Sequence, residues 1–361
     1  MSEFSISKLF RSELLSMSAY KVADAKNLIK LDAMENPYTW PENIQQQWLQ
    51  TLKSCDINRY PDPEARRLSA ALRSSNEISA QSEILLGNGS DEIIQILLMS
   101  LPANAIVLAP EPGFVMYKQV AHSLGLQFKG VPVVADDFSL DLPAMLLAIS
   151  ELQPSLIFLA YPNNPTGNLF DAEAIKQIIF AAPGLVVVDE AYAPFANASF
   201  LSEIGKYKNL LIMRTLSKLG LAGLRLGFLI GHPDLLVQLN KIRLPYNINS
   251  LTQITATFAL NNGSFLLEQT QTLCAERALV FKALEALADI KPYPSAANFI
   301  LFRSLRITAN QLFDALKLQG ILIKNLSSQG GILENCLRVT IGTPDENQIF
   351  LKAMQNILQT T

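Results

Sequence analysis

The sequence predicts an α/β fold built on a mostly parallel sheet with helices on both faces. Short apolar runs of strand length end in turn-forming or polar residues at Ala105–Ala109, Leu156–Ala160, Leu185–Val188 and Leu210–Met213. Helix-like segments such as Asp171–Phe180 lie between these runs. Strands that are apolar on both faces and alternate with helices are typical of a buried parallel sheet. Ligands of such sheets bind at the carboxyl ends of the strands.

The pattern of the chain changes after about Ser250, and 361 residues suffice for about two domains at ~150 residues each. Helices are expected at Leu251–Leu260, Leu266–Leu287 and Ala309–Gln319, strands at Asn298–Arg303, Gly320–Lys324 and Cys336–Gly342, and a helix at the C-terminus. The stretch before Trp40 has little periodicity and is expected to cross the surface of a smaller domain. We therefore predict a large domain over residues 41–250 and a smaller α+β domain made of residues 1–40 and 251–361.

The composition narrows the classes of function. The formal net charge is −3 and no long basic run is present, which disfavours avid binding to nucleic acid or to anionic membranes. The long uncharged stretch Ile93–Pro110 is broken by Pro102, so it is interpreted as a core helix and a buried strand instead of a membrane span. The first residues contain no apolar run of signal-peptide length. A cytoplasmic protein is therefore expected.

The cysteines and histidines do not predict a metal site or a disulfide framework. Cys55, Cys274 and Cys336 are scattered along the chain, and the two histidines are His122 and His232. Because these residues form no CxxC pair and no cluster with metal-ligand spacing, we expect neither feature.

The run "GNGSDEII" (Gly87–Ile94) is typical of a glycine turn followed by a helix that begins near Ser90. The free N–H groups and the dipole of a helix N-terminus suit a phosphate. The alternative is an ordinary helix that Ser90 or Asp91 caps without binding a ligand. A full GxGxxG and a GxxxxGK[ST] are absent, which disfavours the binding of a dinucleotide or a nucleoside triphosphate.

Two further motifs follow buried strands. The run "YPNNPTG" (Tyr161–Gly167) is either only a turn or a turn whose Asn164 donates to a ligand oxygen. In "VVVDEAY" (Val186–Tyr192), Asp189 ends an apolar strand, where a carboxylate is costly to bury unless a cation or strong donors face it. The alternatives for Asp189 are a salt bridge or the cap of the next segment.

Lys218 lies at the end of another buried strand, in "NLLIMRTLSKLG". The ordinary interpretation of such a residue is a solvated surface lysine. Loss of solvation at a strand end would instead lower the pKa of the amine and make it a nucleophile. Ser217 and Arg225 add a hydroxyl and a guanidinium group, which suit a phosphate.

Taken together, these motifs match the needs of pyridoxal 5′-phosphate (PLP). Enzymes that use PLP combine a lysine, an acidic partner for the pyridinium and a cup for the phosphate. The matching residues are the helix start at Ser90 with Ser217 and Arg225 for the phosphate, Asp189 for the ring nitrogen, Asn164 and Tyr192 for the phenolic oxygen, and Lys218 for the aldehyde carbon.

The ordered motifs "GNGSDE", "YPNNPTG", "VVDEAY", "TLSK" followed by "GLR", and "CLRVTIGTPDEN" resemble the class I/II aminotransferases of PLP fold type I. Within this family the chain is most similar to the histidinol-phosphate aminotransferases, through "NRYPDPEARRLSAAL", "LPYNINSLTQ" and "SAANFILFR". The resemblance runs from about Asp32 to the C-terminus. It implies a large domain with a mostly parallel seven-stranded sheet between helices, together with a smaller α+β domain.

The resemblance also implies roles for individual residues. Lys218 would bond the cofactor and then carry a proton between Cα of the substrate and C4′ of the cofactor. The other cofactor contacts would be the backbone amides of Ser90 and Asp91, the side chains of Ser217, Arg225, Asp189, Asn164 and Tyr192, and the ring of Phe114, which would stack on the cofactor ring. Tyr60 would reach the cofactor phosphate of a second subunit, which implies a homodimer. Without the resemblance, Phe114 would be read as plain core and Tyr60 as packing on a proline-rich turn.

For the substrates, the resemblance implies that Arg338 binds the carboxylate of the amino-acid partner and also the phosphate of histidinol phosphate. Lys324 could be a second phosphate contact or a solvated strand end, and Asn36 could line the same pocket. A surface position at a strand end is the alternative for Arg338.

The implied reaction is the exchange of an amino group between L-histidinol phosphate and 2-oxoglutarate, which yields imidazole acetol phosphate and L-glutamate in histidine biosynthesis. Alternatives within the fold are an aromatic amino-acid aminotransferase and an enzyme similar to threonine-phosphate decarboxylase. A dinucleotide-binding oxidoreductase is the alternative from another class, and the missing GxGxxG disfavours it. An inactive relative is disfavoured because both Lys218 and Asp189 are present.

Overall fold

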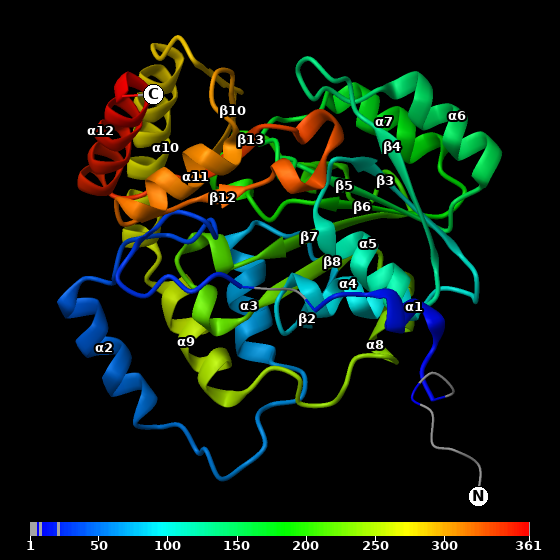
Figure 1. Ribbon diagram of the computed structural model, residues 1–361. Coiled ribbons are helices and arrows are strands. Elements are labelled where there is room, and N and C mark those ends of the chain that lie inside the picture. The colour runs from blue at the N-terminus through cyan, green and yellow to red at the C-terminus, as the bar shows by residue number, and fades with distance from the viewer. Residues whose placement is uncertain (1–5, 7–8, 20–21, 361) are drawn as a thin grey trace, which may run out of the picture.

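The computed structural model describes residues 6, 9–19 and 22–360 and is built on a seven-stranded sheet (Figure 1). Its strands, in spatial order, are β2 (Glu83–Gly87), β8 (Gly227–Gly231), β7 (Leu210–Thr215), β6 (Leu185–Asp189), β5 (Leu156–Ala160), β3 (Ile106–Glu111) and β4 (Gln127–Pro132). Strand β8 runs antiparallel to both of its neighbours, and the other six strands run in one direction. The predicted mostly parallel sheet is confirmed.

Two layers of helices explain why the central strands are continuously apolar. In β5, Leu156 and Phe158 belong to a core shared with α4 (Ser90–Met99), α5 (Val115–Ser123) and α8 (Pro233–Asn240). Ile157 and Leu159 belong to a core on the other face, where α3 (Arg66–Ser75), α6 (Leu142–Leu152) and α7 (Ala172–Ala181) pack. Because successive side chains of a strand point to opposite faces, burial of both faces requires apolar residues at every position.

A second, antiparallel sheet lies beside the first. Its strands, in spatial order, are β12 (Lys324–Asn325), β13 (Cys336–Thr340), β10 (Phe299–Ser304) and β9 (Ile290–Pro292). Helices α10 (Ser264–Glu285), α11 (Ala309–Leu318) and α12 (Pro344–Thr360) share its core. The expectation of one strand over Gly320–Lys324 is wrong. The segment is divided between β12 and a separate strand, β11 (Ile321–Leu322), which pairs with β1 (Ile29–Lys30).

The N-terminal segment contacts both parts of the molecule. While β1 pairs with β11, the short helix α1 (Ser12–Ser16) packs against α5, and the Arg11 guanidinium donates to the carbonyl of Ser123. The remaining long helices also meet, since α9 (Ser250–Asn261) packs on α3 and on α2 (Glu42–Leu52). Residues 1–5, 7–8 and 20–21 of the predicted 1–40 segment, and the last residue, 361, lie outside the described residues.

Within the described part of the chain, no helix combines the length and the apolar character needed to cross a membrane.

Candidate active site

The carboxyl ends of five parallel strands, β2, β3, β5, β6 and β7, meet at one edge of the large sheet. A cavity lies at this edge, in the position where sheets of this type bind ligands. The predicted residues that line it are Ser90, Asp91, Phe114, Asn164, Asp189, Tyr192, Ser217, Lys218 and Arg225. Residues that are far apart in the sequence thus come together because their strands end side by side.

Asp189 is the last residue of β6 and is 5 % exposed. Its Oδ2 accepts a hydrogen bond of 2.5 Å from the Tyr117 hydroxyl, and its Oδ1 accepts one of 3.0 Å from the Ala191 N–H. Burial raises the pKa of the carboxyl to about 6, and these two donors oppose that rise. The structure therefore places a carboxylate, held by two neutral donors, against the cavity.

Lys218 follows β7 in a short 3₁₀ turn, Ser217–Leu219. Burial of the amine, together with the nearby Arg338 guanidinium, lowers its pKa to about 8. The Nζ atom donates to the Ala33 carbonyl at 3.3 Å and lies 5.8 Å from the centre of the Tyr192 ring. A substantial fraction of this amine is therefore neutral near pH 8, as a nucleophile requires.

The cap that the sequence offered as an alternative for α4 does not form. The helix begins at Ser90 with Gly89 as its N-cap, and this cap makes no side-chain hydrogen bond to the N–H groups of the first turn. Gly89 has a φ of +87°, and a Cβ at this position would lie 2.7 Å from Nη2 of Arg225. Only glycine therefore lets the arginine approach the helix start, where the N–H groups and a cation face the same space.

Hydroxyl and guanidinium groups converge on this helix start. Arg225 donates to Oγ of Ser217 at 3.4 Å and to Oδ2 of Asp91 at 3.3 Å. Ser217 Oγ in turn accepts from the Thr215 hydroxyl at 3.0 Å. This group of donors suits an anion with several oxygens, such as a phosphate.

A chain of hydrogen bonds links the large sheet to the second sheet. The Asn164 amide donates to the Tyr192 hydroxyl at 3.0 Å, and its Oδ1 accepts from Nη1 of Arg338 at 2.5 Å. Arg338 lies on β13 with its guanidinium 5.1 Å from the Phe299 ring, and it is 7 % exposed. It is therefore not a surface residue, and it places a buried cation beside the cavity.

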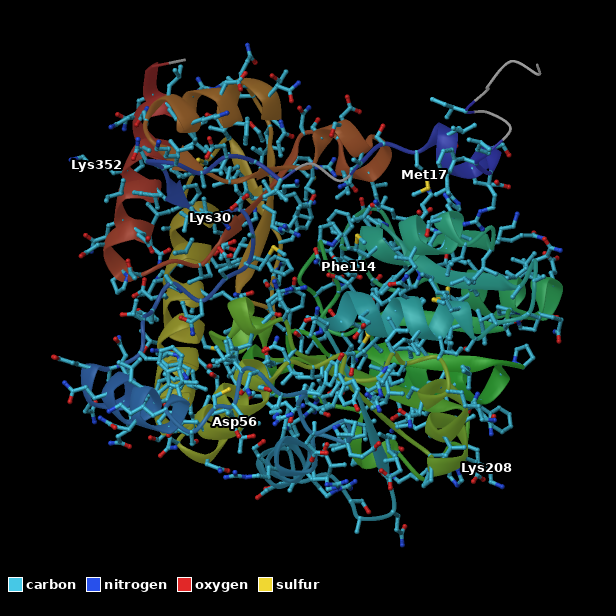
Figure 2. All side chains as sticks on the ribbon, turned by 90° about the horizontal axis from the view of Figure 1, so that it is seen from below. Met17, Lys30, Asp56, Phe114, Lys208 and Lys352 are labelled. Atoms are coloured by element: carbon cyan, nitrogen blue, oxygen red, sulfur yellow. The ribbon has the colours of Figure 1, made fainter. Side chains whose placement is uncertain are left out.

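Phe114 lies directly before α5 and lines the cavity. Figure 2 shows it toward the middle of the molecule, whereas Lys208 and Lys352 lie at the periphery. Its ring packs edge-on against Tyr117, with 5.5 Å between the ring centres. The aromatic side chain is thus half-buried and lines the cavity.

Four predicted residues do not line this cavity: Arg338, which lies beside it, and Tyr60, Asn36 and Lys324. Tyr60 is 80 % exposed and stacks on Tyr246, with 4.5 Å between the ring centres. The Asn36 amide donates to Gln269 at 3.1 Å. Lys324 lies directly opposite Arg338 in the β12–β13 pair, which brings two cationic side chains onto neighbouring positions of one sheet.

Sequence reasoning missed other residues of the site. Tyr117 bonds Asp189, and Thr215 bonds Ser217. The segment around Met34 crosses the cavity, where Met34 lines it and the Ala33 carbonyl accepts from Lys218. The only signal for Tyr117 is its position three residues after Phe114, which places both rings near one helix end.

The second acid of the "DEAY" motif has a different partner. Glu190 has a fully buried side chain, and its Oε2 lies 2.7 Å from Nη2 of Arg214. The same oxygen accepts from Ser199, and Oε1 accepts from the Phe200 N–H. Glu190 therefore supports the loop after β6, while Asp189 alone faces the cavity.

Replacing Glu190 by alanine should lower the free energy of unfolding by about 3–5 kcal/mol, because it leaves the Arg214 charge buried without its partner. A urea titration followed by circular dichroism measures this change. Lys118→Ala is the matched control, since its pair with Glu111 is exposed and should cost less than about 1 kcal/mol. Equal losses in the two variants would contradict a special role for the buried pair.

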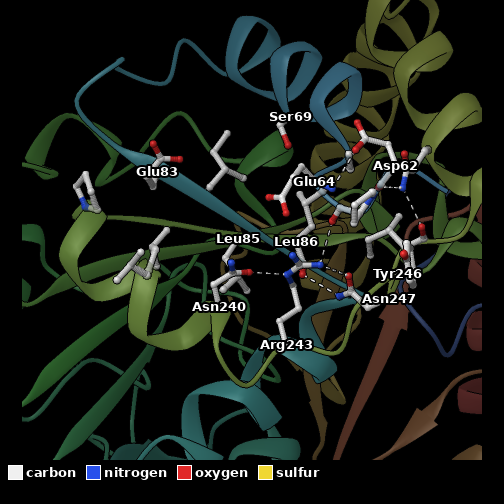
Figure 3. Close-up of a pocket in the computed structure, with 18 residues that line it drawn as sticks. Asp62, Glu64, Ser69, Glu83, Leu85, Leu86, Asn240, Arg243, Tyr246 and Asn247 are labelled. Atoms are coloured by element: carbon white, nitrogen blue, oxygen red, sulfur yellow. Dashed lines mark hydrogen bonds between the residues drawn. The ribbon is translucent and has the colours of Figure 1, made fainter. Parts of the chain in front are cut away.

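A second cavity lies between α3, α8 and β2 (Figure 3). Its polar groups bond one another: Arg243 donates to Asn240 at 2.7 Å and to Asn247 at 2.9 Å, and Asn247 donates to the Leu86 carbonyl at 3.0 Å. Its lining contains none of the predicted site residues. The first cavity is the candidate active site because it holds an amine and a carboxyl whose pKa values burial shifts to about 8 and about 6.

The residues of the first cavity fit the PLP that the sequence predicts. The helix start beside Arg225 suits its phosphate, the buried carboxylate of Asp189 suits a protonated ring nitrogen, and the neutral amine of Lys218 suits its aldehyde. The donors come from strands and turns whose positions the sheet fixes.

This fold and site define the chain as a member of the class I and II aminotransferase family, whose model matches residues 26–354. The chain is similar over nearly its whole length to enzymes named for one reaction. It is 54 % identical over 357 residues to histidinol-phosphate aminotransferase 2 of Nitrosococcus oceani, covering 98 % of this chain and 99 % of that protein. It is 49 % identical over 354 residues to the histidinol-phosphate aminotransferase of Chromobacterium violaceum, covering 98 % and 99 %.

A solved structure of low sequence identity shares the fold. The histidinol-phosphate aminotransferase of Sinorhizobium meliloti, in complex with pyridoxal 5′-phosphate, superposes with a TM-score of 0.86 at 24 % identity and covers 99 % of both chains.

Proposed function

We propose that this protein is a PLP-dependent aminotransferase that interconverts L-histidinol phosphate and 2-oxoglutarate with imidazole acetol phosphate and L-glutamate, in histidine biosynthesis. The observation that carries the reaction type is the pairing of Lys218 and Asp189 in one cavity, with family membership as independent support. The choice of substrate is supported by relatives of 44–54 % identity that carry this name.

Each group of residues in the cavity would bind a different part of the cofactor. Lys218 would bond the aldehyde carbon, and the phosphate would lie against the N–H groups of Ser90 and Asp91 with Ser217 and Arg225. Asp189 would bond the ring nitrogen, Asn164 and Tyr192 the phenolic oxygen, and Phe114 would cover one face of the ring. When bound, PLP supplies an electron sink for the carbanion that proton loss creates. Lys218 would be the group that takes that proton from Cα of the substrate.

The anionic ends of the two substrates would share Arg338. A guanidinium forms paired hydrogen bonds with either a carboxylate or a phosphate, so one residue can serve glutamate and histidinol phosphate in turn. Lys324, directly opposite on β12, is the proposed second phosphate contact. Asn36 would act at the edge of the same pocket, on the segment that crosses the cavity.

Arg338→Ala should raise KM for both histidinol phosphate and 2-oxoglutarate by about 100-fold, because each substrate loses charge-assisted hydrogen bonds. Steady-state kinetics with one substrate varied at a time measure this change. Arg306→Ala is the control, since Arg306 pairs with Asp289 at 3.1 Å outside the cavity. An effect on only one of the two substrates would contradict the shared role.

A coupled assay tests the proposed function directly. Purified protein receives histidinol phosphate and 2-oxoglutarate, and glutamate formation is followed; phenylalanine and threonine phosphate replace histidinol phosphate in parallel reactions. The proposal predicts a much higher kcat/KM with histidinol phosphate. Preferred turnover of phenylalanine, or release of carbon dioxide from threonine phosphate, would replace it by one of the alternatives.

A homodimer completes the proposed site. The exposed ring of Tyr60 lies outside its own cavity, on a surface with Tyr246, so it is free to reach the cofactor phosphate of a second copy. Light scattering tests the dimer, and mixing the Lys218→Ala and Tyr60→Ala proteins tests the shared site by the return of activity.

We also propose that the chain divides into a large domain, residues 41–250, and a smaller domain made of residues 1–40 and 251–361. We further propose a cytoplasmic location, because the three free thiols suit a reducing compartment.

A further inference from the structure

Tyr117 reaches across the fold to Asp189. It lies in the first turn of α5, and its ring stacks on Phe158 of β5 with 4.2 Å between the ring centres and an angle of 2° between the planes. Only 2 % of the residue is exposed. Its hydroxyl donates to Oδ2 of Asp189 at 2.5 Å. Stacking therefore fixes the ring, and the hydroxyl points at one oxygen of the carboxylate.

The direction of this hydrogen bond follows from the two environments. Burial raises the pKa of the Tyr117 phenol well above its ordinary value, so the proton stays on the tyrosine. Burial also favours the protonated form of Asp189, and the bond from Tyr117 is the foremost of the contacts that oppose it. A donor to the charged form stabilises the carboxylate.

We propose that Tyr117 is a positioning residue that keeps Asp189 ionised and oriented toward the ring nitrogen of the cofactor. This inference rests on the role proposed for Asp189. The bonds from the Ala191 N–H to Oδ1 and from Tyr117 to Oδ2 orient the carboxylate, which lines the cavity and keeps lone pairs for a further donor. Tyr117 thus acts on the cofactor only through Asp189.

Tyr117→Phe tests the inference, because phenylalanine keeps the stack on Phe158 and removes only the hydroxyl. Full-length protein freed of cofactor is titrated with two ligands: PLP, and an analogue in which a C–H group replaces the ring nitrogen. We expect the variant to bind PLP about tenfold more weakly, the effect of losing one hydrogen bond to a charged group. Its affinity for the analogue should stay unchanged, because the analogue offers Asp189 no ring nitrogen.

The outcomes separate this inference from the role of Asp189. An equal loss for both ligands, or no loss for either, would overturn the positioning role of Tyr117. Asp189→Asn is titrated with the same ligands. If Asp189→Asn also loses affinity for both ligands equally, or for neither, the role proposed for Asp189 itself is wrong. If Asp189→Asn loses affinity for PLP alone and Tyr117→Phe does not, only the inference on Tyr117 fails.

Two controls guard against a general effect of the substitution. Tyr293→Phe removes a hydroxyl from another buried tyrosine, which packs edge-on against Phe138 outside the cavity, and it should leave both affinities unchanged. Thermal melting of the cofactor-free proteins checks that Tyr117→Phe folds. A Tyr117→Phe protein that melts at a lower temperature but loses affinity for PLP alone would still support the inference, since the two ligands differ only at the ring nitrogen.

Discussion

Replacing Lys218 by alanine should lower the rate of transamination by at least ~10⁴-fold, because the variant loses the amine that bonds the cofactor and the base that moves the proton. PLP should still bind, held at its phosphate, but without a covalent link to the protein. The coupled assay measures the first effect, and mass spectrometry of the reduced protein measures the second. Lys208→Ala is the matched control, because Lys208 lies on the surface just before β7.

The pH dependence of cofactor capture tests the environment of the same lysine. Only a neutral amine attacks an aldehyde, and the pKa of Lys218 is lowered from 10.5 to about 8. The protonated form therefore dominates below pH 8 and the neutral form above it. Stopped-flow mixing of cofactor-free protein with PLP should show a rate that rises as the pH approaches 8 and then levels off. A rate that keeps rising to pH 10 would contradict the desolvated amine.

Asp189→Asn should lower kcat by about 10²–10³-fold, the range expected when one preorganised electrostatic contact to developing charge is lost. The amide keeps the volume of the carboxylate and its place beside Tyr117, but it cannot hold a proton on the ring nitrogen. Steady-state kinetics measure the loss, and reconstitution at high PLP concentration separates it from weaker binding.

Asp171→Asn is the control for that substitution. Asp171 caps α7 by accepting from the Ala174 N–H at 2.9 Å, and asparagine caps a helix about as well. A similar loss of kcat in both variants would mean that stability, and not the site, explains the result.

The central strands of the large sheet could be predicted because burial on both faces requires an unbroken run of apolar residues in the sequence. The run Leu156–Ala160 is entirely apolar and coincides with β5. Asp189 and Lys218 stood out because ionisable residues at the ends of such runs are costly to bury. The candidate catalytic residues could therefore be predicted from the positions where an ionisable residue ends an apolar strand.

Contacts between distant segments could not be predicted in the same way. The division of Gly320–Lys324 depends on Ile29 pairing with Ile321, and no periodicity in either segment indicates that pairing. Tyr117 looks like an ordinary core residue of a helix. Only the crossing of α5 over β5 and β6 brings its hydroxyl to Asp189. Such residues act through tertiary geometry, which local sequence patterns do not record.

The most direct test of the central claim is to find the lysine that carries the cofactor. Borohydride reduction of the protein with bound PLP makes the carbon–nitrogen bond permanent, and proteolysis followed by mass spectrometry locates the label. The account predicts a pyridoxyl group on Lys218, in the peptide that contains Ser217, and none in the Lys218→Ala protein. A label on another lysine, or none on the wild-type protein, would contradict the assignment of this cavity as the active site.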